Sequence, residues 1–182
     1  MDLISYLFSL PVLLYVRRST EMFMNFVISF LRKQFPDSPG IQTNELNDKI
    51  DNNENVLLVD CRRPDEYQIS RIPNATNIHF KCSDDDLKTA LAEVDPNVTI
   101  VNYCSLGYRS GVMTKRILDL DLDNVAKDKV YNLEGSIFKW AEEERPLLDF
   151  KEQPTKFVHP FSYKFAIPTL SRSKWKWQPE DQ

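Results

Sequence analysis

The chain has 182 residues, which is enough for one domain with a hydrophobic core and extra segments at its ends. Its formal net charge of −4 argues against a nucleic-acid partner, because surfaces that bind nucleic acid are normally basic. Cys61, Cys82 and Cys104 form an odd set without the spacing of a disulfide framework, so we expect a reducing, intracellular compartment, either the cytoplasm or an organelle.

Residues 1–16 are apolar on all sides and are followed by Arg17 and Arg18. The segment is shorter than the roughly 20 apolar residues that a helix needs to span a bilayer. It carries Asp2 in place of a basic start, which argues against both a signal peptide and a mitochondrial presequence. We assign neither targeting function to it.

Residues 21–34 are predicted to form an amphipathic helix with Ser19 or Thr20 as its N-cap. Its apolar positions recur at helical spacing and are Met22, Phe23, Phe26, Val27, Phe30 and Leu31. In one interpretation, residues 1–35 form a hairpin or an interfacial anchor on a membrane surface. In the other, the second helix packs on the globular domain or on a partner. We favour membrane association, because this much apolar surface outside a domain of roughly 110 residues is hard to bury in one monomer.

Residues 36–40 carry the prolines and the glycine that end this helix and open the domain. Thr43 is predicted to cap a helix through Ile50. Residues 56–60 form a continuous apolar run that suits a strand buried on both faces. The strand ends in Asp60, at the sheet edge where open α/β folds place their sites.

Asp60 and Arg62 are supporting candidates for such a site. They either orient the site by hydrogen bonds or form a structural ion pair beneath it. Cys61 stands between them and is interpreted as a core residue, although it is the candidate partner if Cys104 forms an internal disulfide.

The rest of the domain alternates strands and helices. Residues 75–80 and 99–103 are predicted as strands, and residues 84–94 between them as a helix with its apolar residues on one face. A strand over 129–133 and a helix over 136–144 follow. This order predicts an α/β domain with a mostly parallel central sheet flanked by helices.

Cys104 directly follows the third predicted strand, and Ser110 is predicted to cap the next helix. The first backbone N–H groups of a helix have no intrahelical partner, so the loop between strand and helix favours an anion such as a thiolate. The Arg109 guanidinium is expected to lower the pKa of the Cys104 thiol as well.

Glycine usage points to the same loop. The chain has only 4 Gly, and Gly107 and Gly111 flank Arg109. A turn with positive φ, or a close approach of the backbone to an anion, would require glycine there.

Three ordered motifs carry a family resemblance. Residues 104–110, CSLGYRS, resemble the active-site loop of single-domain rhodanese-type sulfurtransferases, which has the pattern C-x-x-G-x-R. Residues 56–78 resemble the first signature of that family, and residues 130–147 resemble its last strand and the Trp-bearing helix after it. The resemblance spans residues 38–150 and implies a rhodanese-like domain.

The resemblance implies that Cys104 is the nucleophile and that Arg109 stabilises the charge of the sulfur it carries. The substrate-binding loop would consist of Ser105, Leu106, Gly107, Tyr108 and Ser110. Cys104 would take sulfane sulfur from thiosulfate or a persulfide and pass it to a thiol acceptor, a small molecule or a protein thiol. No cofactor and no metal are expected, since the H-x-x-C spacing of His79 and Cys82 has no second pair nearby.

Loop length separates two chemistries on this fold. Four residues separate Cys104 from Arg109, the spacing that the resemblance associates with sulfur transfer, whereas related cell-cycle phosphatases have a wider loop. The spacing favours sulfur over phosphoryl chemistry. Two alternatives remain, a phosphatase on the same fold and a non-catalytic, membrane-associated binding module.

Some positions depart from the family pattern. Ser70 and Arg71 stand where the family usually has Gly-His, and Asn74 and Ser136 stand where glycine is common. None lies in the catalytic loop, so they leave the assignment of Cys104 unchanged and weaken only roles carried over to those turns.

Residues 151–182 hold 6 Lys and Arg against 3 Asp and Glu, and they include Trp175 and Trp177. Such a segment either touches a membrane interface or forms a disordered tail with exposed aromatic side chains. His159 is interpreted as structural rather than catalytic. The predicted units are N-terminal apolar helices over 1–35, the rhodanese-like domain over 38–150 and a C-terminal tail over 151–182.

Overall fold

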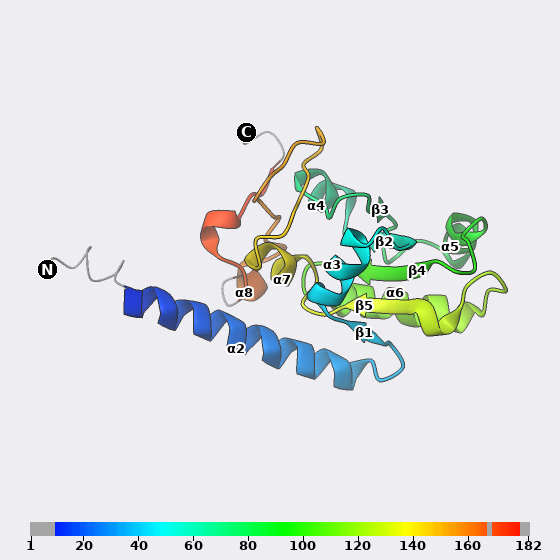
Figure 1. Ribbon diagram of the computed structural model, residues 1–182, viewed down its shortest axis with the longest axis horizontal. Coiled ribbons are helices and arrows are strands. Elements are labelled where there is room, and N and C mark those ends of the chain that lie inside the picture. Colours follow the sequence, from blue (N-terminus) through cyan, green and yellow to red (C-terminus); the bar gives the residue numbers. More distant parts are fainter. Residues whose placement is uncertain (1–9, 167–168, 179–182) are drawn as a thin grey trace, which may run out of the picture.

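The protein has an open α/β sheet with a long helix running alongside it (Figure 1). The computed structural model describes residues 10–166 and 169–178. In this part of the chain the sheet has five strands in the order β1-β5-β4-β2-β3, and every neighbouring pair is parallel. The strands are β1 (Gly40–Ile41), β2 (Val56–Asp60), β3 (Thr76–Asn77), β4 (Thr99–Tyr103) and β5 (Val130–Leu133). The predicted α/β fold with a parallel sheet is confirmed.

Helices cover both faces of the sheet. They are α3 (Thr43–Asp51), α4 (Pro64–Ile69), α5 (Asp84–Leu91), α6 (Tyr108–Leu120), α7 (Ser136–Glu142) and α8 (Tyr163–Ala166), with 3₁₀ turns at Lys127–Lys129 and Arg172–Lys174. Val59 and Ile100 share a hydrophobic cluster with α5 and α6, whereas Leu58 and Val101 share another with α3 and α7. Successive strand residues point to opposite faces, so a continuous apolar run serves both helical layers.

Within the domain, two elements end three residues before their predicted boundaries. The predicted strand over 75–80 pairs with β2 only at Thr76 and Asn77. A turn closed by the Cys82 N–H, which donates to the His79 carbonyl at 2.8 Å, then leads the chain away from the sheet edge. The predicted helix over 84–94 ends at Leu91, because the chain tightens into a turn there.

Thr43 was predicted to be the N-cap of α3, but it is the first residue of that helix. Gln42 occupies the N-cap position. The Thr43 hydroxyl instead donates to Glu143 Oε1 at 2.9 Å, across to the end of α7. A tertiary contact therefore uses the group that the local pattern assigns to the cap.

The N-terminal segment forms one continuous helix, α2 (Leu10–Gln34). Pro11 lies in its first turn, where a missing N–H breaks no hydrogen bond. The helix runs through residues 17–20, so the predicted break and the N-cap at Ser19 or Thr20 are wrong. Neither glycine nor proline stands between residues 12 and 34 to interrupt it. Residues 1–9 of the first predicted segment lie outside the described residues.

Helix α2 packs on the domain along one side. Met24, Ile28 and Leu31 are buried, whereas Phe26 and Phe30 are 65% and 55% exposed. Of the two interpretations of this helix, packing on the domain is the arrangement that the structure has. None of the helices among the described residues is long and apolar enough to cross a bilayer.

The C-terminal segment folds back onto the same side of the molecule, where α7 and α8 lie near the N-terminal half of α2 (Figure 1). Val158, Ala166 and Leu170 are buried in one cluster with Met24 and Ile28 of α2. The chain also pairs with itself here, because the Val158 N–H donates to the Lys174 carbonyl at 2.7 Å. For the described residues, this packing rules out the disordered-tail alternative.

Candidate active site

The predicted nucleophile lies at the carboxyl edge of the sheet. Strand β4 ends at Tyr103, and α6 begins at Tyr108 with Gly107 as its N-cap. Gly107 has a φ of +116°, and a Cβ there would lie 3.1 Å from Leu31 Cδ1. The backbone conformation therefore requires glycine at this position, and the approach of α2 leaves little room for a side chain there.

The carbonyl groups of the loop are held by the start of α7. The Ile137 N–H donates to the Cys104 carbonyl at 3.1 Å, and the Phe138 N–H donates to the Ser105 carbonyl at 3.2 Å. These first amides of α7 have no acceptor within their own helix. The free N–H groups of α7 and the carbonyl groups of the loop thus satisfy each other's hydrogen bonding. The loop is fixed at its first two residues, Cys104 and Ser105.

Ser136 holds Cys104 from the same side. Its hydroxyl accepts a hydrogen bond from the Cys104 N–H at 3.2 Å and donates to the Leu133 carbonyl at 3.1 Å. Ser136 has a φ of +50°, and Asn74, another non-glycine residue at a position where glycine is common, has a φ of +64°. The positive φ explains the expected glycine at both positions. Serine is less favourable than glycine in this backbone conformation, but its hydroxyl makes a hydrogen bond with the Cys104 N–H that glycine could not make.

The sulfur of Cys104 is almost fully buried and accepts a hydrogen bond from the Gly107 N–H at 3.1 Å. Burial by itself raises the pKa of this thiol, but the Arg109 charge and the groups of Ser110 and Gly107 that point to the sulfur outweigh it. The pKa of Cys104 is therefore below the usual value for cysteine. The loop favours a thiolate.

Ser110 has a different place from the predicted one. It lies inside the first turn of α6, so it is not the N-cap. Its buried hydroxyl makes no hydrogen bond of standard geometry to a described residue. Its proximity to the sulfur nevertheless lowers the pKa of Cys104.

Arg109 is paired with a glutamate that the sequence prediction did not include. Its guanidinium donates to both carboxylate oxygens of Glu66, at 2.6 and 2.8 Å, and to the Ser105 hydroxyl at 2.8 Å. Glu66 is fully buried in α4. Burial alone would raise its pKa, but the hydrogen bonds and charge of Arg109 lower the pKa of Glu66 to about 2. Arg109 and Glu66 therefore form a buried ion pair whose two charges cancel.

Sequence reasoning missed Glu66 because the residue also has a local function. Its Oε2 accepts from the Arg63 N–H at 3.2 Å, the contact of an acid in the first turn of a helix. That contact is sufficient to explain an acidic residue after Pro64. The pairing with Arg109, across 43 positions of sequence, leaves no local pattern.

Asp60 and Arg62 form a fully buried ion pair. The Arg62 guanidinium donates to the two Asp60 oxygens at 2.9 and 2.6 Å and to the Ser70 carbonyl at 2.5 Å. Within the described part of the chain, no hydrogen bond joins this pair to residues 104–110. Of the two predicted roles, the geometry matches the structural ion pair.

Cys61 continues β2 at the level where Cys104 continues β4, and its N–H donates to the Tyr103 carbonyl at 2.8 Å. Burial, then the proximity of Cys104 and Asp60, raises the pKa of the Cys61 thiol well above its usual value. All three cysteines are free thiols. The geometry agrees with a core role for Cys61.

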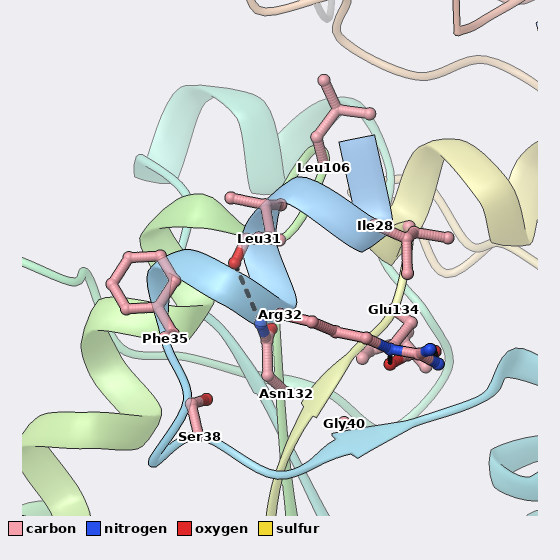
Figure 2. Close-up of a pocket in the computed structure, with 12 residues that line it drawn as sticks. Ile28, Leu31, Arg32, Phe35, Ser38, Gly40, Leu106, Asn132 and Glu134 are labelled. Atoms are coloured by element: carbon pink, nitrogen blue, oxygen red, sulfur yellow. Dashed lines mark hydrogen bonds and ion pairs between the residues drawn. The ribbon is translucent and has the colours of Figure 1, made fainter. Parts of the chain in front are cut away.

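The end of α2 lies across the catalytic loop. Figure 2 shows Leu31 and Phe35 there, with Arg32 reaching to Glu134. Arg32 Nη2 donates to Glu134 Oε2 at 2.6 Å. The Phe35 ring packs edge-on against Tyr108 with centroids 5.4 Å apart.

Gly111 serves the docking of α2 rather than an anion. A Cβ at this position would lie 2.8 Å from Phe35 Cδ2. Asn132 of β5 completes the support, because its amide donates to the Gly107 carbonyl at 3.0 Å below the loop (Figure 2). The loop is thus held by α7, β5 and α2 together.

A metal centre is not evident in the described part of the chain, where no three His, Cys, Asp or Glu side chains come together. His159 is buried, and its Nδ1 accepts from the Phe161 N–H at 3.0 Å, while burial lowers its pKa. The predicted structural role of His159 matches this geometry.

Comparison with known proteins gives a family match. Residues 42–143 match the model of a family described as a rhodanese-like domain. Over 103 residues the chain is 29% identical to the adenylyltransferase and sulfurtransferase uba4 of Sclerotinia sclerotiorum, which covers 53% of this chain and 23% of that protein. The chain therefore spans about a quarter of the length of that fungal relative.

Two further relatives show the extent of the likeness. The chain is 27% identical over 108 residues to a sulfurtransferase of Allochromatium vinosum, which covers 59% of this chain and 92% of that protein. The crystal structure of a thiosulfate sulfurtransferase from Pseudomonas aeruginosa aligns with a TM-score of 0.54 at 21% identity, over 71% of this chain and 23% of that one. At this identity the structural likeness concerns the fold alone.

Proposed function

The chain belongs to the rhodanese-like domain family, and on that basis we propose that it is a sulfurtransferase in which Cys104 carries sulfane sulfur as a persulfide. The observation that carries this proposal is the contact of the Gly107 N–H with Cys104 Sγ, at 3.1 Å, in a loop with four residues between cysteine and arginine. A sulfur anion in that position is held by backbone donors of the loop and of the first turn of α6.

In the first step the Cys104 thiolate attacks the outer sulfur of a donor, thiosulfate or an organic persulfide. A new S–S bond forms to Cys104 while the S–S bond of the donor breaks. The leaving group, sulfite or a thiolate, departs with the electron pair. The product is Cys104–S–S⁻, whose charge lies near the same N–H groups that favour the thiolate.

In the second step an acceptor thiolate attacks the terminal sulfur of this persulfide. The bond between the two sulfur atoms of the enzyme persulfide breaks, and Cys104 is regenerated as a thiolate. The acceptor leaves as its own persulfide, so the cycle needs no oxidant, no reductant and no cofactor.

Arg109 contributes charge more than direct ligation in this cycle. Both ends of its guanidinium already contact Glu66, and a third contact holds Ser105. It therefore fixes the loop and lowers the pKa of Cys104 without offering an unpaired cation to a donor. The same closed pair counts against the phosphatase alternative, since a phosphate would need that cation.

We expect the intact protein to gain the mass of one sulfur atom after incubation with thiosulfate or an organic persulfide, with the added sulfur mapped to the peptide of Cys104. The variant Cys104→Ser should gain none. Cys61→Ser is the matched control, because Cys61 is a buried thiol that the mechanism does not use. Sulfur uptake by Cys104→Ser would contradict the mechanism, and hydrolysis of an aryl phosphate that depends on Cys104 would favour the phosphatase.

A further inference from the structure

A cavity of about 580 Å³ opens beside the nucleophile. Cys104, Ser105 and Arg109 line it on the side of the catalytic loop. The remaining lining side chains are apolar or aromatic, and the largest are Phe23, Phe26, Phe30, Tyr108 and Phe161. The volume lies within the range of small-molecule sites, roughly 300 to 1,000 Å³.

Most of this aromatic lining comes from outside the matched family domain, residues 42–143. We call Phe23, Phe26, Phe30 and Phe161 the aromatic wall; three of them belong to α2 and one to the C-terminal segment. The family domain supplies the sulfur chemistry, whereas the added segments supply the surface that a substrate meets beside it.

The aromatic wall is fixed to the loop rather than loosely placed. Leu31 packs over Gly107, and Phe35 packs against Tyr108 and Gly111. Phe161 lies over the Arg109 guanidinium, with its ring centroid 4.6 Å from Cζ. These contacts tie both added segments to the residues around Cys104.

The cavity offers no unpaired positive charge. Arg109 is the one charged residue among the described residues that line it. Both terminal nitrogens of its guanidinium donate to Glu66, one of them also donates to Ser105, and one face is covered by Phe161. A small dianion such as thiosulfate would lose its hydration here without gaining an ion pair. An apolar group would meet aromatic carbon.

The exposure of the aromatic wall supports the same conclusion. Phe26 is 65% exposed and Phe30 55%, and Tyr108 at the mouth of the cavity is 55% exposed. Large aromatic side chains that remain in water beside a nucleophile bury their apolar surface when a substrate covers them.

We propose that the sulfur donor of this protein is an organic sulfane-sulfur compound with a hydrophobic alkyl or aryl body, which the aromatic wall binds while its outer sulfur reaches Cys104. This inference rests on the proposed function and specifies its substrate class. The cavity binds the body of the donor, and the catalytic loop receives the sulfur.

Alkanethiosulfonates, R–SO₂–S⁻, are suitable probes because chain length changes the body while the reacting group stays the same. The Cys104 thiolate attacks the outer sulfur, the bond to the sulfonyl sulfur breaks, and the sulfinate R–SO₂⁻ leaves with the electron pair. Cyanide then removes the sulfur as thiocyanate and restores the thiolate. Cyanide is too small to need the cavity, so the dependence on R reports donor binding.

With the full chain, we expect kcat/KM to rise by about fourfold for each methylene added from methane- to hexanethiosulfonate, the gain expected for burying a methylene. Benzenethiosulfonate should exceed thiosulfate by at least about tenfold, since its ring can be buried against aromatic side chains. The series needs no variant, so it does not depend on the folding of a mutant.

The double variant Phe26→Ser/Phe30→Ser should reduce the rise per methylene to less than half of the wild-type value. Both side chains are more than half exposed, so the fold is expected to persist. Met22→Ser is the matched control: Met22 is 69% exposed on the same helix but does not line the cavity, and the rise should be unchanged.

A flat or falling series with turnover of every donor would overturn this inference while leaving the proposed function intact. Absence of thiocyanate and of a Cys104 persulfide with every donor would overturn both. Cosedimentation with phosphatidylcholine vesicles, lost in the double variant, would also overturn it, because the aromatic wall would then be a lipid-binding surface.

Discussion

The Cys104 thiolate and the Glu66 carboxylate are charged groups in buried positions, where burial by itself favours the neutral form. Each is stabilised by its neighbours: the sulfur by Arg109, Ser110 and Gly107, and the glutamate by the guanidinium. At the scale of single residues, the chemistry of the site therefore depends on a few short contacts that can be removed one at a time.

Ser110→Ala should raise the pKa of Cys104, because the variant loses a hydroxyl group that favours the thiolate. The midpoint of the pH dependence of Cys104 alkylation should move to higher pH. Ser70→Ala is the matched control, since Ser70 also has a buried hydroxyl without a hydrogen-bond partner among the described residues. An unchanged midpoint in Ser110→Ala would show that the hydroxyl does not act on the sulfur.

Glu66 should make the protein sensitive to acid. Its pKa of about 2 in the folded state lies below the ordinary value of 4.5, so its contribution is present above pH 4.5 and is lost as pH falls toward 2. A difference of this size corresponds to about 3 kcal/mol of unfolding free energy.

Glu66→Gln should lower the free energy of unfolding at pH 7 by about 3 to 5 kcal/mol, because Arg109 would be left as a buried charge without its partner. Urea unfolding at pH 7 and at pH 3 measures both effects. The control is Glu54→Gln, which removes a half-exposed pairing with Lys49 and should change stability by less than about 1 kcal/mol. Equal losses in the two variants would contradict a special role for Glu66.

The packing partner of helix α2 is a feature that its sequence alone does not reveal. The 3.6-residue period predicts a helix whose apolar side consists of Met22, Phe23, Phe26, Val27, Phe30 and Leu31. Of these residues only Leu31 is buried, and the side that packs on the domain is formed by Met24, Ile28 and Leu31. The period does not say what covers it. Packing on the domain and binding to a membrane need the same pattern. Tertiary contacts such as those of Leu31 with Gly107 and of Arg32 with Glu134 distinguish them.

The effect of Gly111→Ala on the free energy of unfolding should depend on whether Phe35 is present. In the wild-type background the new methyl group would meet the Phe35 ring, and overpacking should lower the unfolding free energy by about 1 to 2 kcal/mol. In a Phe35→Ala background the same change should stabilise by up to about 1 kcal/mol, since alanine is the better helix former. A double-mutant cycle by urea unfolding measures the coupling; identical effects in both backgrounds would mean that α2 does not dock there in solution.

Across the whole molecule, the parallel sheet and the place of Cys104 at the end of a strand were predictable because they depend on local patterns: apolar strands, a glycine turn and a helix start within residues 99–111. Glu66 and the aromatic wall were not, because their contacts join positions far apart in the chain. The expectation that this much apolar surface is hard to bury in one monomer was wrong for Met24 and Ile28, whereas Phe26 and Phe30 are more than half exposed. It treated the two ends separately, whereas they pack in one cluster.

The residues of the aromatic wall are synthesised at different times, because three of them precede the domain in the chain and Phe161 follows it. Chains are made from the N-terminus, and domains tend to fold as they emerge. The α2 helix and the strands that hold Cys104 are complete before Phe161 is added. We therefore expect a nascent chain to acquire its reactive thiolate while one side of the cavity is still missing, so that reactivity precedes selectivity during synthesis.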